Sequence, residues 1–223
     1  MDKYLSIITN FGCHFKCPYC ITKNTGIDIP KTTMEGLDCL SLFIKKFDID
    51  IVSVSGGGDP LYGYMDLKDA TSYYWYKHLF NILSDLGIKF ELHTSYIDND
   101  FYRVHGKDCY RIVYHLRDYK QLESIKRYDN EIVRVVFIVT EDMTKEDIDK
   151  IADYCKNSDV IDELSFRQMV DENYQTTFYH YDYLKKYHKA RWYYIEQCDY
   201  NIYYCENKIF TRFEDMRGGV TND

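Results

Sequence analysis

Apolar residues along the chain follow two spacings in turn, one typical of buried strands and one typical of helices with a single apolar face. Continuous apolar runs predict six strands, at residues 4–9, 49–55, 88–95, 110–116, 132–140 and 160–170. Apolar residues three or four positions apart predict helices from Thr32 onward and over 73–86, 118–128 and 145–157. Strands that alternate with helices form a parallel sheet with right-handed crossovers. Six units are too few for a closed eight-stranded barrel, so the pattern predicts an α/β fold, a partial (βα)6 TIM-like barrel with a mostly parallel sheet.

Local signals mark three of the helix boundaries. Glu35 follows Thr32 by three residues, which is the spacing of a capping box at a helix start. Thr144 and Asp147 mark the start of the helix over 145–157. Gly87 directly follows the helix over 73–86, where glycine is the usual left-handed terminal residue.

The sequence after residue 170 predicts a short extension to the barrel. It begins with a tyrosine-rich stretch of helical character, which two strand-like runs follow at 192–204 and 208–213. A strand pair joined around residues 205–207 accounts for these runs. The sequence therefore predicts two domains, a core barrel over 1–170 and a C-terminal helix and strand-pair extension over 171–223.

Charge and composition limit the classes of partner. The formal net charge is −8, whereas proteins that bind nucleic acid usually carry a basic footprint. The one dense basic run, at 185–191, is expected to be the solvated face of a helix. No segment approaches the roughly 20 apolar residues of a membrane span, and the first nine residues lack the features of a signal peptide. With 24 tyrosines among 223 residues, the composition is typical of an AT-rich genome. The expected location is thus the cytoplasm of a bacterium, or of its host if a phage encodes the protein.

Three closely spaced cysteines follow the first predicted strand. Cys13, Cys17 and Cys20 have the spacing C-x3-C-x2-C, and the eight cysteines of a cytoplasmic protein indicate metal binding or catalysis rather than disulfides. Iron–sulfur clusters are commonly held by cysteines this close together. Because a cuboidal cluster normally takes four thiolates, three of them leave one iron free for a substrate or cofactor. Two alternatives stay open here: a zinc site with His14 as its fourth ligand, and free thiols at a chance spacing.

A run of glycines follows the second predicted strand. Residues 55–61 read Ser-Gly-Gly-Gly-Asp-Pro-Leu, and glycine lets a backbone approach a ligand closely. A plain turn between a strand and a helix has the same pattern, but its place after the cysteine triplet favours a ligand site. With both motifs, and with Tyr19 just before the last cysteine, the sequence resembles the radical S-adenosylmethionine (radical SAM) superfamily over roughly residues 4–170.

The resemblance implies a chemistry and a set of cofactor-binding residues. Members hold a [4Fe–4S] cluster on three cysteines and cleave S-adenosylmethionine reductively, so that a 5′-deoxyadenosyl radical takes a hydrogen atom from the substrate. The implied cluster ligands are Cys13, Cys17 and Cys20. The implied contacts to the cofactor are Gly57, Gly58, Asp59 and Pro60, which stand in the places of a Gly-Gly-Glu-Pro motif, and the neighbourhood of Tyr19, which would pack against adenine. Aspartate here replaces the commoner glutamate.

Polar residues on predicted strands add further candidates, because strands of a parallel sheet are normally apolar on both faces. Glu91, His93 and Ser95 share one side of the third strand, and His115 and Arg117 share one side of the fourth. If these sides face the lumen, they line the end of the barrel where ligands bind. The stretch His115-Leu116-Arg117 resembles the family's Asp-Leu-Lys variant. The resemblance then implies Arg117 as a contact to the cofactor's carboxylate, and His93, Ser95 and His115 as contacts to ribose or substrate.

The remaining candidates concern the substrate. Arg167 on the sixth strand either meets an anionic substrate group or forms an outward salt bridge. Cys198 and Cys205 are either hydrogen-atom donors or free structural thiols, whereas Cys39 and Cys155 are expected to be apolar core residues.

The expected activity leaves the substrate open. A peptide or protein side chain and a nucleotide or modified base both suit a short, open barrel, and flavodoxin or ferredoxin would supply the electron. Activation of a glycyl-radical enzyme is an alternative activity, and a zinc-binding interaction module without enzymatic activity is the alternative from another class.

Overall fold

The computed structural model describes residues 2–64, 66, 68–187, 192–195 and 202–216. Its strands form one nine-stranded sheet in the order β7-β6-β5-β4-β3-β2-β1-β8-β9. Eight neighbouring strands run parallel, and β9 alone runs antiparallel to β8. The strands are β1 Tyr4–Thr9, β2 Ile51–Gly56, β3 Lys89–Thr94, β4 Arg111–Leu116, β5 Ile132–Val139, β6 Glu163–Gln168, β7 Trp192–Ile195, β8 Ile202–Cys205 and β9 Lys208–Phe210.

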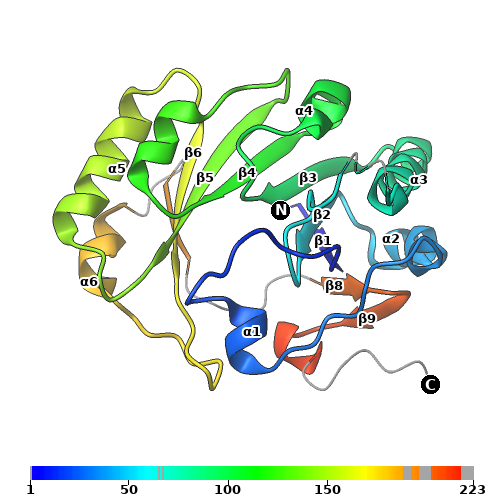
Figure 1. Ribbon diagram of the computed structural model, residues 1–223, viewed down its shortest axis with the longest axis horizontal. Helices are drawn as coiled ribbons and strands as arrows, with labels where there is room; N and C mark the ends of the chain where they lie inside the picture. Colours follow the sequence, from blue (N-terminus) through cyan, green and yellow to red (C-terminus); the bar gives the residue numbers. More distant parts are fainter. Residues whose placement is uncertain (1, 65, 67, 188–191, 196–201, 217–223) are drawn as a thin grey trace.

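Most of the helices cover one side of this sheet (Figure 1). The α-helices are α1 Ile21–Thr25, α2 Leu40–Phe47, α3 Thr71–Leu86, α4 Asp100–His105, α5 Lys145–Asn157 and α6 Tyr181–Leu184. Short 3-10 turns are η1 Glu35–Leu37, η2 Gly106–Asp108, η3 Tyr119–Ser124, η4 Lys185–Tyr187 and η5 Phe213–Met216. Figure 1 shows the sheet as a curved wall that does not close, with α2, α3, α4 and α5 along its outer side. The predicted α/β fold with an open, mostly parallel sheet is therefore confirmed.

The two faces of the sheet differ in chemistry. Outward residues such as Val52, Leu92 and Ile112 pack with helix residues such as Leu40 and Leu79 in the main apolar core. The alternate residues, which point inward, include many polar and charged side chains. Helices therefore bury the outer face, and the inner face is available for a polar site.

Several elements agree with the sequence-based expectations. All six predicted strands are present, with ends that differ by at most a few residues. Helix α5 begins with the capping box of Thr144 and Asp147, and α3 ends at Gly87, which has a φ of 66°.

Two helix predictions are wrong. The helix expected from Thr32 begins only at Leu40, because the Thr32 hydroxyl accepts a hydrogen bond from the Asn10 amide at 2.7 Å instead of capping a helix. The helix expected over 118–128 is the 3-10 turn η3, after which Ile125 is already extended. Its apolar residues Leu122 and Ile125 are three apart, which matches the three residues per turn of a 3-10 helix.

The expected C-terminal strand pair is right only in part. β8 and β9 form the hairpin around residues 206–207. The expected single strand over 192–204 is instead two strands, since β7 pairs with β6 and β8 pairs with β1 at the other side of the sheet. A run of apolar and aromatic residues does not reveal that its two halves pair with strands so far apart. The division into domains at residue 170 stays a prediction.

The short helices α1 and α4 were not expected, since five and six residues are too few to show a helical period. In the described part of the chain, none of the helices has the length and apolar character that crossing a membrane requires.

Candidate functional site

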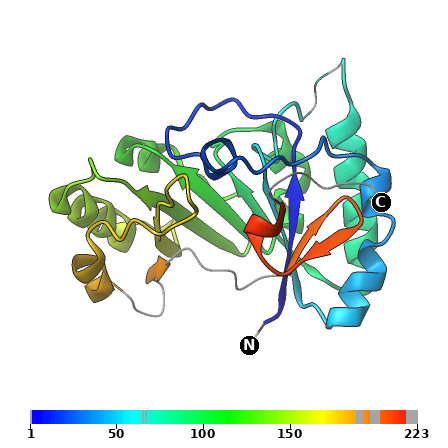
Figure 2. The same cartoon turned by 90° about the horizontal axis from the view of Figure 1, so that it is seen from below.

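The cysteine loop lies beyond the carboxyl end of β1, where ligands bind in sheets of this kind. Figure 2 shows this loop and α1 past the tip of the β1 arrow. The loop is compact, because the Cys20 amide donates to the Cys17 carbonyl at 3.2 Å and Cys20 precedes the first turn of α1. Burial raises the pKa of the Cys17 thiol; Arg117 opposes this rise, and the neighbouring Cys13 and Cys20 add to it. The structure thus brings the three predicted cluster ligands together at one place.

Three thiols on one short loop are the type of donor that iron–sulfur clusters take. Among the described residues, no three His, Cys, Asp or Glu side chains converge as the ligands of one metal ion would. Two thiolates on one zinc lie about 4 Å apart, given a Zn–S bond of about 2.3 Å. The three cysteines of an iron–sulfur cluster each bind a different iron and stand around the cluster. The three cysteines therefore fit a [4Fe–4S] cluster by the type of their donor atoms, and the cluster itself stays a prediction.

Contacts from His14 and Arg117 hold the cysteine loop over the ends of β3 and β4. The His14 ring packs between Phe15 and Tyr96, with ring centroids 3.9 Å from each. Its Nε2 lies 3.3 Å from the hydroxyl of Ser95, just after β3. The guanidinium of Arg117, just after β4, lies 3.4 Å from the Phe15 ring centroid. These contacts place Ser95 and Arg117 beside the cysteine loop, and their contacts to the cofactor stay predictions. The zinc site with His14 as its fourth ligand stays an open alternative, since Nδ1 of His14 is buried without a hydrogen-bond partner among the described residues.

The glycine loop after β2 packs directly on the cysteine loop. The Asp59 amide donates to the Gly12 carbonyl at 2.8 Å. A Cβ atom on Gly58 would lie 2.1 Å from the same carbonyl oxygen, and one on Gly57 would lie 2.6 Å from the Cβ of Ile29. Because real Cβ atoms do not approach so closely, only glycine permits this packing. The close approach that the sequence predicts toward a ligand is thus present here toward the cysteine loop.

The Asp59 carboxylate is buried between the ends of β2 and β3. Its Oδ1 accepts hydrogen bonds from the Thr94 hydroxyl at 2.8 Å and the Leu61 amide at 3.0 Å. Its Oδ2 accepts from the Ser95 amide at 2.7 Å and the Ser95 hydroxyl at 2.5 Å. A carboxylate has about four lone-pair sites, so these donors occupy it. Asp59 therefore braces the glycine loop against β3; its contact to the cofactor stays a prediction.

The glycine packing gives a testable expectation for Gly58→Ala. The added methyl group would displace the Gly12 backbone, so we expect a loss of about 1–3 kcal/mol of unfolding free energy and severalfold less iron per chain after anaerobic reconstitution. Gly87→Ala is the matched control, because Gly87 has a φ of +66° and open space around it, far along the chain from the site. It is expected to cost about 1–2 kcal/mol of backbone strain and to leave iron binding unchanged. Equal iron content in the two variants would show that this packing does not shape the site.

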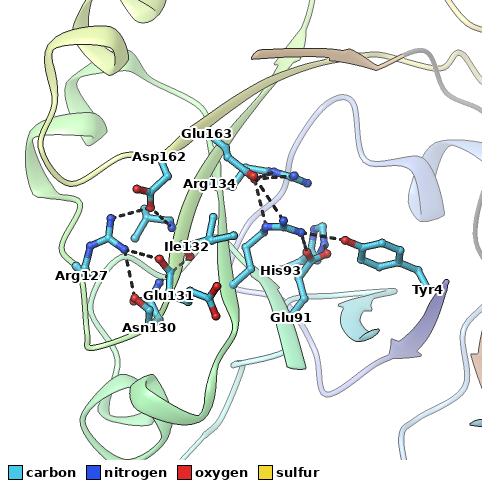
Figure 3. Close-up of polar contacts among 12 residues, drawn as sticks. Tyr4, Glu91, His93, Arg127, Asn130, Glu131, Ile132, Arg134, Asp162 and Glu163 are labelled. Atoms are coloured by element: carbon cyan, nitrogen blue, oxygen red, sulfur yellow. Dashed lines mark hydrogen bonds and ion pairs between the residues drawn. The ribbon is translucent and has the colours of Figure 1, made fainter. Parts of the chain in front are cut away.

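Buried and half-buried ion pairs lie on the inner face of the sheet, toward the amino-terminal ends of β3 to β6 (Figure 3). Arg111 on β4 pairs with Glu91 on β3 and, at 3.2 Å, with Glu163 on β6. Arg134 on β5 pairs with Glu163 at 2.6 Å, and the Tyr4 hydroxyl accepts a hydrogen bond from Arg111 at 3.2 Å. Two arginines and two glutamates balance in charge, as buried charges must. We call these five residues the ionic floor. Only Glu91 was noticed in the sequence, although charged residues inside the apolar runs of β4, β5 and β6 are a visible signal.

Two histidines extend from the ionic floor toward the carboxyl ends of the strands. His93 Nε2 lies 2.7 Å from Oε1 of Glu91, and His93 Nδ1 lies 3.0 Å from Nε2 of His115. Burial lowers the pKa of His115 well below its ordinary value, and the nearby His93 and Arg167 lower it further. Arg167 shares the inward-facing alternation of Glu163 on β6, and its charge lies near enough to His115 to lower that pKa. Its contact to a substrate stays a prediction.

The remaining cysteines lie in different surroundings. Cys198 is outside the described residues. Cys205 is 1% exposed, in a small apolar cluster with Ile8, Ile27 and Met216, and burial raises its pKa to about 12. Cys155 is buried in the main core, as expected. The same expectation is wrong for Cys39, which is only half-buried and lies just before α2. Hydrogen-atom donation by Cys198 or Cys205 stays a prediction.

Comparison with solved structures shows which fold this is. No protein-family model and no curated protein matches the sequence. Streptococcus suis SuiB bound to the precursor peptide SuiA matches with a TM-score of 0.68 and 16% identity, over 100% of this chain and 62% of that chain. Native anSMEcpe with bound AdoMet matches with a TM-score of 0.56 and 17% identity, over 82% of this chain and 57% of that chain. Methylornithine synthase (PylB) matches with a TM-score of 0.54 and 14% identity, over 79% and 56%.

The matched proteins are all radical SAM enzymes. The chain therefore has the fold of that class, and the likeness supports the resemblance that the cysteine and glycine motifs suggest. The chain spans about three fifths of the length of these solved chains.

Proposed function

We propose that this chain is a radical SAM enzyme that holds a [4Fe–4S] cluster on Cys13, Cys17 and Cys20. When bound, the cluster and S-adenosylmethionine supply an electron transfer that breaks the cofactor's S–C5′ bond and gives a radical able to take a hydrogen atom from a substrate. One observation carries the proposal: the loop with three cysteines lies at the carboxyl end of β1 and packs on the glycine loop after β2. The fold shared with radical SAM enzymes supports it.

The protein's own residues position the cofactor and shape the lumen. The three thiolates hold the cluster. Arg117 lies beside Cys17, where its positive charge suits the carboxylate of the cofactor. Ser95 is held in place by Asp59, so its position is fixed before a ligand arrives. Fixed polar groups of this kind lose little further freedom when a ligand binds.

A peptide is the substrate class that the comparisons favour. SuiB was solved with a precursor peptide, and anSMEcpe was solved with AdoMet and the Kp18Cys peptide. The net charge of −8 argues against a nucleic-acid substrate. Flavodoxin or ferredoxin is the proposed electron donor.

The experiment is an anaerobic assay on reconstituted protein. The protein is purified without oxygen, loaded with iron and sulfide, reduced with dithionite and mixed with S-adenosylmethionine. We expect a brown protein with charge-transfer absorbance and release of 5′-deoxyadenosine with methionine.

Each of the other outcomes would indicate a different function for the chain. A colourless chain with one zinc per molecule would indicate the zinc-binding module. An intact cluster without nucleoside release would indicate a barrel that binds the cofactor without chemistry. Transfer of a radical to a glycyl-radical enzyme would indicate an activase.

A further inference from the structure

The hydrogen bonds of the two interior histidines determine where their protons lie. The Glu91 carboxylate is ionised and only accepts, since it already pairs with Arg111. The Nε2 atom of His93, 2.7 Å away, must therefore carry a proton. In the neutral ring Nδ1 of His93 is then an acceptor, so Nε2 of His115, 3.0 Å away, is the donor.

This order leaves one free acceptor at the end of the chain of hydrogen bonds. In neutral His115 the remaining lone pair lies on Nδ1, and no residue in the described part of the chain donates a hydrogen bond to it. The His115 side chain is half-buried rather than sealed. Hydrogen bonds through the His93 ring thus connect His115 to the buried Glu91 carboxylate.

The charges around His115 favour an additional proton on His93 rather than on His115. Arg167 on β6 and His93 on β3 both oppose positive charge on His115, and only Glu91 favours it. Arg111, on the same strand as His115, already balances part of the negative charge of Glu91. His93 is in direct contact with the carboxylate, so an extra proton is more stable there than on His115.

From this geometry we infer that His115, His93 and Glu91 form a proton relay, in which Nδ1 of His115 accepts a proton from a substrate in the lumen. The substrate carries a hydroxyl or amide N–H group next to the reacting carbon. Its O–H or N–H bond breaks and the electron pair stays on the substrate atom, while the proton bonds to Nδ1 of His115. The proton on Nε2 of His115 moves to Nδ1 of His93, so the positive charge comes to lie beside Glu91. No electron passes to or from these residues. The relay rests on the proposed function only in assuming that a substrate enters the lumen.

The test reads the ring protons by nitrogen NMR on the full chain, labelled at histidine and purified before iron is added. Variants His93→Gln and His115→Gln assign the signals. At pH 8 we expect both rings to carry their proton on Nε2. As the pH falls, the first proton taken up should change the signals of both rings at one midpoint, because that proton belongs to the pair.

Two carboxylate variants separate the relay from general electrostatics. Glu91→Gln keeps an acceptor for His93 but removes the charge, so the midpoint should fall by at least about one pH unit, a tenfold loss of proton affinity. Glu163→Gln removes an equal charge from the ionic floor without touching a histidine, and should move the midpoint by less than half of that.

Three results would overturn the inference: a proton on Nδ1 of His93 at pH 8, separate midpoints for the two rings in the uptake of the first proton, or equal shifts in both carboxylate variants. If a variant does not fold, the wild-type ring protons and midpoints decide. Because neither cluster nor cofactor is present, the relay can fail while nucleoside release succeeds, and the reverse.

Discussion

Replacement of Cys17 by alanine is expected to abolish iron binding and to reduce the release of 5′-deoxyadenosine by more than about a hundredfold. Loss of a residue that only supports a metal ligand already costs about 10–100-fold, so loss of a ligand itself should cost more. Two thiolates also leave a second iron without a protein ligand, which destabilises the cluster rather than opening its site. The measurement is iron per chain and nucleoside per minute after anaerobic reconstitution and reduction.

The control for this prediction is Cys39→Ala. Cys39 is a half-buried thiol just before α2, away from the cysteine loop in sequence. It is expected to keep both iron and activity, which excludes a general effect of removing a thiol. If the Cys17 variant kept its iron and its nucleoside release, the cluster assignment could not stand.

Replacement of Arg111 by methionine is expected to lower the free energy of unfolding by about 3–5 kcal/mol at pH 7, the usual cost of leaving buried partners uncompensated. Arg111 lies at the centre of the ionic floor and contacts both of its glutamates. Methionine has a similar length and fills much of the space. The lost free energy of unfolding therefore reflects the removed charge more than lost packing. Urea unfolding followed by circular dichroism measures it.

The pH dependence of this loss has a definite sign. Burial opposes ionisation of Glu91, but the hydrogen bond from His93 and the charge of Arg111 outweigh it, so the pKa of Glu91 falls from 4.5 to about 2. A lowered pKa stabilises the folded state above about pH 4.5, and this contribution disappears as the pH falls through about 2. The advantage of the wild type over Arg111→Met should therefore shrink between pH 4.5 and pH 2.

Arg103→Met is the matched control for Arg111→Met. Arg103 pairs with Asp100 at 2.7 Å, but its side chain is 68% exposed, and exposed pairs contribute about 0–1 kcal/mol. A loss in Arg111→Met no larger than in this control would mean that the floor contributes little to stability.

The sequence revealed those parts of the fold that depend on local pattern. Strand β1 and helix α5 have the expected bounds, because an apolar run and a capping box are each contained in a few neighbouring residues. The cysteine and glycine loops were located by the same kind of short motif. Their mutual packing follows from β1 and β2 being parallel neighbours.

The parts that the sequence did not reveal depend on contacts between distant residues. Arg111 and Glu163 are 52 residues apart, and only the register of β4, β5 and β6 brings them together. The occupied carboxylate of Asp59 depends likewise on Thr94 and Ser95, 35 and 36 residues away. Strands β7 and β8 pair with different neighbours, β6 and β1, and the composition of the segment does not reveal which strand each one pairs with.

The position of β8 has a consequence for how the molecule assembles. Strand β1, which leads into the cysteine loop, pairs on one side with β2 and on the other with β8, whose residues come almost 200 positions later. Contacts between residues so far apart form late, because a long intervening segment must first be restricted. On the ribosome, the strand nearest the cysteines therefore has one unpaired edge until nearly all the described chain has emerged. Such an edge is open to pairing with other chains, so growing chains are exposed to association at the strand that leads into the cysteine loop.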